Sequence, residues 1–272
     1  MSSDPNPVLS SKRSRLISTV LSPAVRFWLR SQVEFVEHLE FQIEGGDRQI
    51  LSGHIPGITV AATQVVYQGI HLRQIALNAQ EIRVNLGQVL KGKPLRLLAT
   101  IPVEGEVCLH EDDLNASLRS PFLAEASREV LLPLLQASIA NSQTGKWGDR
   151  LTDLQDLQVS IQGDRLILTG QLLTDPEPPD PTEGQPLPFA ISLGLQILEG
   201  CRLRFVQPQW FVQPQWLPHP VEPESQFLPN HVPTLTAFES FEADLGTEVN
   251  LRELAIADGK ILCQGRINVV PA

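Results

Sequence analysis

The densest group of ionisable side chains in this sequence is the run His110-Glu111-Asp112-Asp113. Side chains of these types act as general acids and bases, or as metal ligands, when a fold brings several of them together. Here the acids are consecutive, and the helix dipole explains an acidic run where a helix begins. The pattern therefore indicates an acidic helix start rather than a catalytic or metal site.

Other sequence signals of chemistry are missing as well. The chain contains no G-x-S-x-G, no Walker loop, no dinucleotide-binding fingerprint and no H-E-x-x-H. Its six histidines show no metal-ligand spacing. We therefore predict a non-enzymatic protein with no catalytic residue, no metal site and no cofactor.

The three cysteines, Cys108, Cys201 and Cys263, are odd in number and form no C-x-x-C pair. This indicates neither a disulfide framework nor a zinc site, and it favours a reducing compartment. The polar N-terminus lacks the pattern of a secretory signal, and no apolar run reaches the roughly 18 residues of a membrane span. We expect a cytoplasmic protein, with peripheral membrane association as a further option.

Charge is unevenly distributed along the chain. Acids outnumber Lys plus Arg by 31 to 21, which argues against nucleic acid as a partner. Residues 1–33 nevertheless carry a net charge of +4, so the remaining residues carry −14. Such asymmetry suggests that the two parts face different surroundings.

Residues 8–33 have the periodicity of an amphipathic helix, which Pro23 after Ser22 interrupts or restarts. Its apolar face carries Leu16, Val20, Phe27 and Trp28, and its polar face carries Arg26 and Arg30. One interpretation is an interfacial helix whose apolar residues contact lipid while the two arginines meet headgroups. The other is a helix that docks on the core of its own domain. We assign residues 1–33 to this basic helix.

Beyond residue 38 the dominant period is two, which is typical of antiparallel strands with one buried face. Several of these strands are about ten residues long, against a usual five or six. The alternation slips by one residue between Ala79 and Ile82, which predicts a β-bulge. We assign residues 34–272 to a single β-rich domain.

One long helix interrupts the strands, beginning at Ser120-Pro121 and kinked at Pro133. The predicted class is α+β, mostly β, with a long curved antiparallel sheet wrapped around this helix. Residues on its broad apolar face would line the enclosed space: Phe122, Val130, Leu131 and Leu134. Packed cores and cavity walls use the same residue types, so the pattern does not say whether the space is open.

Residues 205–216 repeat the hexapeptide FVQPQW in tandem. Pro208 and Pro214 cannot donate in a central ladder, so we expect an edge strand or a protruding loop. Trp210 and Trp216 would then either meet a membrane interface or cover the edge of the domain. The repeat leaves both interpretations open.

Three segments carry a resemblance to a known family: RQILSG at 48–53, NLGQVLKGKPL at 85–95 and DLNASL at 113–118. In this order they resemble the cyanobacterial branch of the LmeA-like phospholipid-binding domain family, formerly a domain of unknown function. The resemblance is best over residues 16–172. It implies a tubular lipid-binding-like fold and a phospholipid ligand, without assigning any residue a catalytic or lipid-contacting role.

Two function hypotheses follow from the residues and the resemblance together. The first is a non-catalytic protein that binds or carries phospholipid or another acyl lipid at a membrane surface, which is anionic if the arginines contact it. The alternative is a scaffold or protein-interaction module with a closed core, no lipid and a partner that the sequence does not identify.

Overall fold

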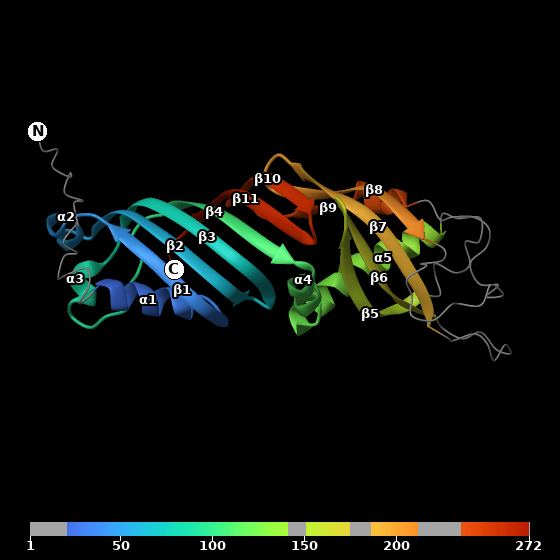
Figure 1. Ribbon diagram of the computed structural model, residues 1–272, viewed down its shortest axis with the longest axis horizontal. Helices are drawn as coiled ribbons and strands as arrows, with labels where there is room; N and C mark the ends of the chain where they lie inside the picture. Colours follow the sequence, from blue (N-terminus) through green and yellow to red (C-terminus); the bar gives the residue numbers. More distant parts are fainter. Residues whose placement is uncertain (1–20, 141–150, 175–185, 212–234, 272) are drawn as a thin grey trace, which may run out of the picture.

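The computed structural model describes residues 21–140, 151–174, 186–211 and 235–271 (Figure 1). Strands dominate these residues, and their pairings are antiparallel. The coarser prediction, a mostly β protein with curved antiparallel strands and a few helices, is confirmed, whereas one long sheet wrapped around the long helix is not. The strands do not form one continuous sheet, however: they divide between two sheets, and each sheet packs against its own helix.

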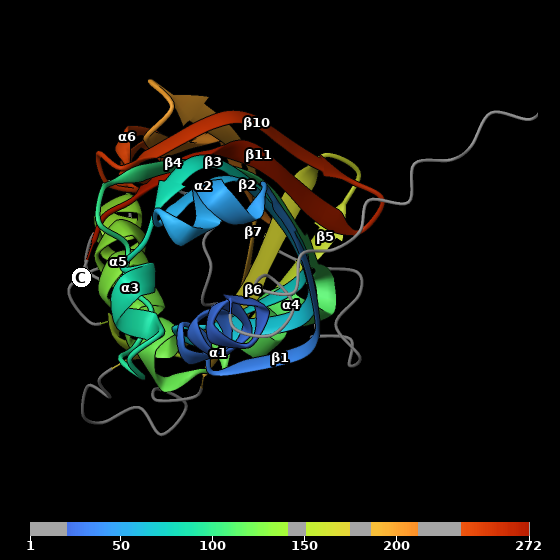
Figure 2. The ribbon, with the colours of Figure 1, turned by 90° about the vertical axis from the view of Figure 1, so that its left-hand side faces the viewer.

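The first sheet has six strands in the order β1-β2-β3-β4-β11-β10. It bends around helix α1 (Ser22–Ser31), as the end-on view of Figure 2 shows. Two short helices, α2 (Asp47–Leu51) and α3 (Leu86–Val89), lie at the end of the molecule away from the second sheet. The strands are β1 (Phe35–Glu44), β2 (His54–Tyr67), β3 (Ile70–Arg83), β4 (Ile101–His110), β10 (Val249–Ala257) and β11 (Lys260–Val269).

The second sheet has five strands in the order β5-β6-β7-β8-β9 and packs against the long helix α5 (Pro121–Ala140). Leu131, Leu135 and Ile139 of α5 belong to the same buried cluster as Phe189 and Trp210. Short helix α6 (Thr236–Ser240) adds Phe238 to that cluster. The strands are β5 (Leu151–Gln162), β6 (Arg165–Thr174), β7 (Leu187–Leu198), β8 (Arg202–Phe211) and β9 (Glu242–Asp244).

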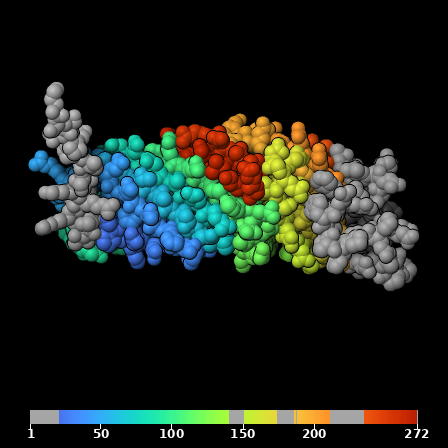
Figure 3. Space-filling model, in the orientation of Figure 1, coloured from blue at the N-terminus to red at the C-terminus, as the bar shows by residue number. Residues whose placement is uncertain are grey.

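Helix α4 (Glu111–Leu118) joins the two sheets, which lie along one elongated body (Figure 3). One side of α4 binds β3, because Asp113 pairs with Arg73 at 3.0 Å and the Ser117 hydroxyl accepts the His71 N–H at 2.8 Å. The other side binds the edge strand β5 through Asn115 and Glu111. The acidic helix start is thus a junction between sheets.

The predicted change of phase between Ala79 and Ile82 is present, but it is not a bulge with one unpaired residue. Both residues are buried, and Glu81 between them has φ 55°, in the left-handed region. The pairing of β3 with β2 keeps its register across this point. In both strands the alternation of inward and outward side chains therefore shifts by one residue at the same point. Beyond it, each strand continues to present apolar side chains to the inside of the bend.

Candidate binding cavity

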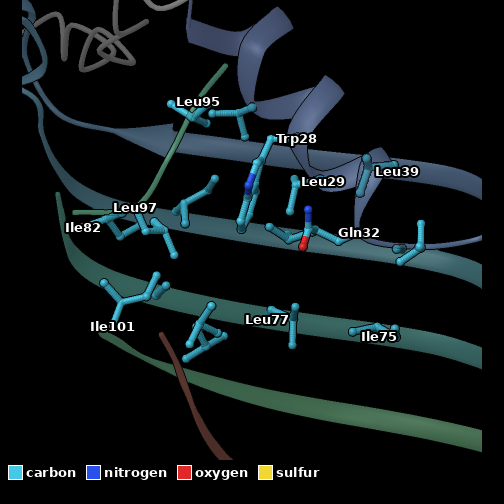
Figure 4. Close-up of a pocket in the computed structure, with 18 of the residues that line it drawn as sticks. Trp28, Leu29, Gln32, Leu39, Ile75, Leu77, Ile82, Leu95, Leu97 and Ile101 are labelled. Atoms are coloured by element: carbon cyan, nitrogen blue, oxygen red, sulfur yellow. The ribbon is translucent and has the colours of Figure 1, made fainter. Parts of the chain in front are cut away.

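An apolar cavity of about 600 Å³ lies between α1 and the concave face of the first sheet (Figure 4). This volume is within the range of about 300–1,000 Å³ that is usual for small-molecule sites. Most of the wall comes from branched aliphatic side chains on the strands. The strand residues are Val36, Leu39, Ile55, Ile58, Val60, Ala62, Val65, Tyr67, Ile75, Leu77, Ala79, Ile82, Ile101, Val103, Ile267 and Val269.

Helix α1 forms one side of the cavity. It begins at Ser22 with Pro23 in its first turn, and Val25 is buried against the first sheet. The side chains of Trp28 and Leu29 extend from α1 toward the strands (Figure 4). Phe27, on the opposite side of the helix, is 76 % exposed. The helix thus covers the sheet through its apolar side while leaving space beneath it.

The segment between α3 and β4 closes the cavity next to α1. Pro94, Leu95, Arg96 and Leu97 line the wall, and the side chain of Asn85 holds them in place. The Asn85 carboxamide donates to the Pro94 carbonyl at 3.0 Å and accepts the Arg96 N–H at 2.7 Å. Asn85 is 7 % exposed, so these bonds replace hydration that its amide has lost. The NLGQVLKGKPL motif therefore encodes a fixed wall of the cavity.

Few polar side chains reach the cavity. Gln32 points into it from the end of α1 (Figure 4), and its amide donates to the Ser31 hydroxyl at 3.2 Å. Arg96 belongs to the lining but is an exposed residue, and its guanidinium has no carboxylate within 4.0 Å among the residues that the structure describes. Trp28 and Tyr67 add an indole and a phenol. The lining is therefore suited to hydrocarbon, with a few groups that could orient a polar end.

The residues predicted on the N-terminal helix have different places. Trp28 lines the cavity, whereas Phe27 faces outward. Arg26 is exposed and lies over the Phe41 ring at 5.6 Å, and Arg30 is exposed in the last turn of α1. Leu16 and Val20 lie outside the described residues.

The four residues predicted on the long helix lie away from this cavity. Leu131 is buried and Leu134 is partly buried in the cluster beneath the second sheet. Val130 is half-buried, and Phe122 is 66 % exposed near the start of α5. Of the face that periodicity indicates, Leu131 and Leu134 pack beneath the second sheet, and the sequence did not reveal which of the two sheets the helix would cover. Lining residues such as Ile75, Leu77 and Ile101 follow the predicted alternation, yet nothing in the pattern separates them from core residues.

The acidic run on α4 has structural partners. Asp113 is 5 % exposed, pairs with Arg73 and also accepts the His110 N–H at 2.9 Å. Glu111 accepts the Ile161 N–H at 2.8 Å. Over the described ranges no group of three His, Cys, Asp or Glu side chains could hold a metal ion. None of the described helices is both long and apolar enough to cross a membrane.

A bent antiparallel sheet with a helix across its concave side leaves an apolar cavity whose size and lining suit an apolar ligand. Comparison with known families is consistent with this geometry. The chain belongs to the family described as LmeA-like phospholipid-binding, which it matches over residues 13–266. The match extends well beyond residues 16–172, where the resemblance was best in the sequence. No curated protein and no solved structure matches the chain.

Proposed function

We propose that this protein is a non-catalytic phospholipid carrier that holds acyl chain in the cavity beneath α1. The observation that carries the proposal is the 600 Å³ space walled almost entirely by aliphatic and aromatic side chains. Membership of a family described as phospholipid-binding supports the same ligand class. Burial of acyl chain contributes about 0.8 kcal/mol per methylene, so affinity should rise with the length of chain that the cavity encloses.

We also propose that the protein works at a membrane surface, from the cytoplasmic side. The exposed Arg26 and Arg30 on α1 are suited to anionic headgroups beside the cavity. Reversing both to Glu should abolish sedimentation with anionic vesicles while the fold is retained. Unchanged sedimentation would show that these arginines do not bind headgroups.

The architecture supports an interpretation as a tubular lipid-binding-like fold of the cyanobacterial branch, with one change. The bend that encloses space surrounds α1, whereas the long helix α5 fills the inner side of the second sheet. In this proposal the first sheet provides the ligand site and the second provides a closed core. Phe122, Val130, Leu131 and Leu134 would then stabilise the carrier rather than touch the ligand.

Native mass spectrometry of the gently purified protein, followed by lipid extraction, tests the proposal. We expect a stoichiometric phospholipid adduct that dissociates on activation. A protein without lipid that also ignores phospholipid vesicles would contradict the proposal and favour an interaction module that binds another protein.

A further inference from the structure

The segment around α3 has a charge unlike the rest of the chain. Residues 82–103 contain Arg83, Lys91, Lys93 and Arg96 and no acidic residue, in a protein of net charge −10. All four side chains belong to exposed residues. A local positive surface of this kind attracts anionic partners even when the whole protein is acidic.

These four cations also lack the ion-pair partners that six other described arginines have. Arg73, Arg128 and Arg202 each form an ion pair with a carboxylate, as do Arg204, Arg252 and Arg266. Within the described part of the chain, no carboxylate lies within 4.0 Å of the cations at 83, 91, 93 and 96. Their charge is therefore free to act on a partner in solvent.

Apolar side chains flank the same cations. Leu90 is 50 % exposed and Leu98 is 61 % exposed, although both adjoin the buried wall of the cavity. Cations interleaved with exposed leucines are the composition of surfaces that lie in the boundary between headgroups and acyl chains. A partner that offers only anionic charge would leave the two leucines in water.

The same segment is continuous with the cavity. Between Leu90 and Leu98, residues 94–97 form its wall, and the Asn85 carboxamide fixes them in one conformation. Lys93 is held as well, because its N–H donates to the Gln88 carbonyl at 3.0 Å. The charged surface and the apolar lining are thus two sides of one rigid segment at the end of the molecule that carries α3 (Figures 1 and 2).

We infer that residues 90–98 are the docking surface through which the cavity meets an anionic bilayer. Lys91, Lys93 and Arg96 contact lipid phosphates, and Leu90 and Leu98 enter the outer edge of the hydrocarbon. The inference rests on the proposed lipid-carrier function and adds the place where lipid enters and leaves. It makes Arg96, at the cavity wall, the first cation that a departing headgroup meets.

The test compares two double charge reversals in the full-length protein. Lys91→Glu with Lys93→Glu alters the docking surface. Arg119→Glu with Lys260→Glu makes the same change in net charge at two exposed cations that neither line the cavity nor form an ion pair among the described residues. Vesicles of phosphatidylcholine alone and of phosphatidylcholine with phosphatidylglycerol serve as probes in co-sedimentation.

Each lysine near an anionic surface contributes about fivefold to partitioning, and each glutamate adds repulsion, so the Lys91/Lys93 variant should bind the anionic vesicles at least about 25-fold more weakly than wild type. The Arg119/Lys260 variant should bind like wild type. Equal losses in the two variants, or wild-type protein that ignores anionic vesicles, would overturn the inference.

Replacing Leu90 and Leu98 by Ser provides a second test with a different dependence on salt. The loss of vesicle binding caused by the lysine substitutions should shrink at high ionic strength, because salt screens the charges. The loss caused by the leucine substitutions should persist. Retained binding in the Leu90/Leu98 variant at every salt concentration would exclude insertion. Native mass spectrometry of the lipid carried by each variant reports on the cavity separately. A variant that carries normal lipid but no longer binds vesicles has lost docking alone. Wild-type protein that carries no lipid would contradict the carrier function itself.

Discussion

The carboxamide of Asn115 forms two hydrogen bonds with the backbone of Val159. Its amino group donates to the Val159 carbonyl at 2.7 Å, and its oxygen accepts the Val159 N–H at 2.9 Å. Val159 lies on β5, the edge strand of the second sheet, so Asn115 supplies the bonds that a neighbouring strand would make. Only a side chain with both a donor and an acceptor can do this.

We predict that Asn115→Ala lowers the free energy of unfolding by about 1–3 kcal/mol, because it leaves two partly buried backbone groups without partners. Asn78→Ala is a suitable control, since Asn78 is exposed and donates only one long bond, at 3.4 Å, to Thr59. Urea unfolding measures both. Equal midpoints would show that α4 does not hold the sheets together through Asn115.

Asn85 should matter in the same way for the cavity wall. Asn85→Ala removes the bonds to Pro94 and Arg96, and we expect a loss of about 1–3 kcal/mol together with faster amide exchange over residues 90–98. Gln88→Ala, at an exposed neighbour, should change exchange much less. Unaltered exchange in the Asn85 variant would mean that the wall is held by other contacts.

Glu242 should make the second sheet sensitive to acid. The hydrogen bond from Arg204, with the charge of Arg202, lowers the pKa of the Glu242 carboxyl below its ordinary value of 4.5. A carboxyl with a lowered folded-state pKa contributes stability that is present above the unfolded pKa and is lost as pH falls through the folded one.

Urea midpoints measured between about pH 6 and pH 3 should therefore fall less steeply in Glu242→Gln than in wild type. Glu40→Gln, on β1, is the control, because Glu40 is exposed and takes part in no ion pair of the described residues. Parallel pH profiles in all three proteins would contradict this role of Glu242.

Trp28 should report directly on the cavity. Phospholipid with brominated acyl chains quenches a nearby indole on contact, so the bound protein should lose part of its tryptophan fluorescence. Trp28→Phe should remove most of that quenching. Trp210→Phe should retain it, because Trp210 is 6 % exposed and stacks on Phe189 beneath the second sheet. Equal quenching in the two variants would place the lipid elsewhere.

Much of the fold follows from the sequence because alternation marks strands by a local rule. The long strands follow from alternation and the helix after Pro121 from helical periodicity, whereas the family was indicated by the resemblance of three short segments. The division into two sheets could not be predicted, since it depends on pairings between strands far apart in the chain, such as β11 with β4. Which residues line the cavity is equally non-local, because Ile58 and Leu77 have the same pattern as residues of a packed core.

The tandem FVQPQW repeat is a second case in which the sequence pattern did not determine where the side chains lie in the fold. Its first copy lies on β8, where Pro208 falls at a register shift against β7, so no ladder bond is required of it. Trp210 is a core residue and not an exposed interface residue. Trp216 of the second copy lies outside the described residues.

The most direct test of lipid carriage is to fill the cavity from within. Ala62 and Ala79 line it on neighbouring strands, whereas Ala61 and Ala76 are exposed and pair with each other across the same strands. Phenylalanine at 62 and 79 occupies the space that acyl chain needs, and phenylalanine at 61 and 76 adds the same bulk to exposed positions.

Native mass spectrometry of the two double variants beside wild type then gives the decisive comparison. We predict that the protein with Ala62→Phe and Ala79→Phe loses the phospholipid adduct, while the protein with Ala61→Phe and Ala76→Phe carries as much lipid as wild type. A folded Ala62/Ala79 variant with undiminished lipid would contradict the claim that this cavity is the site.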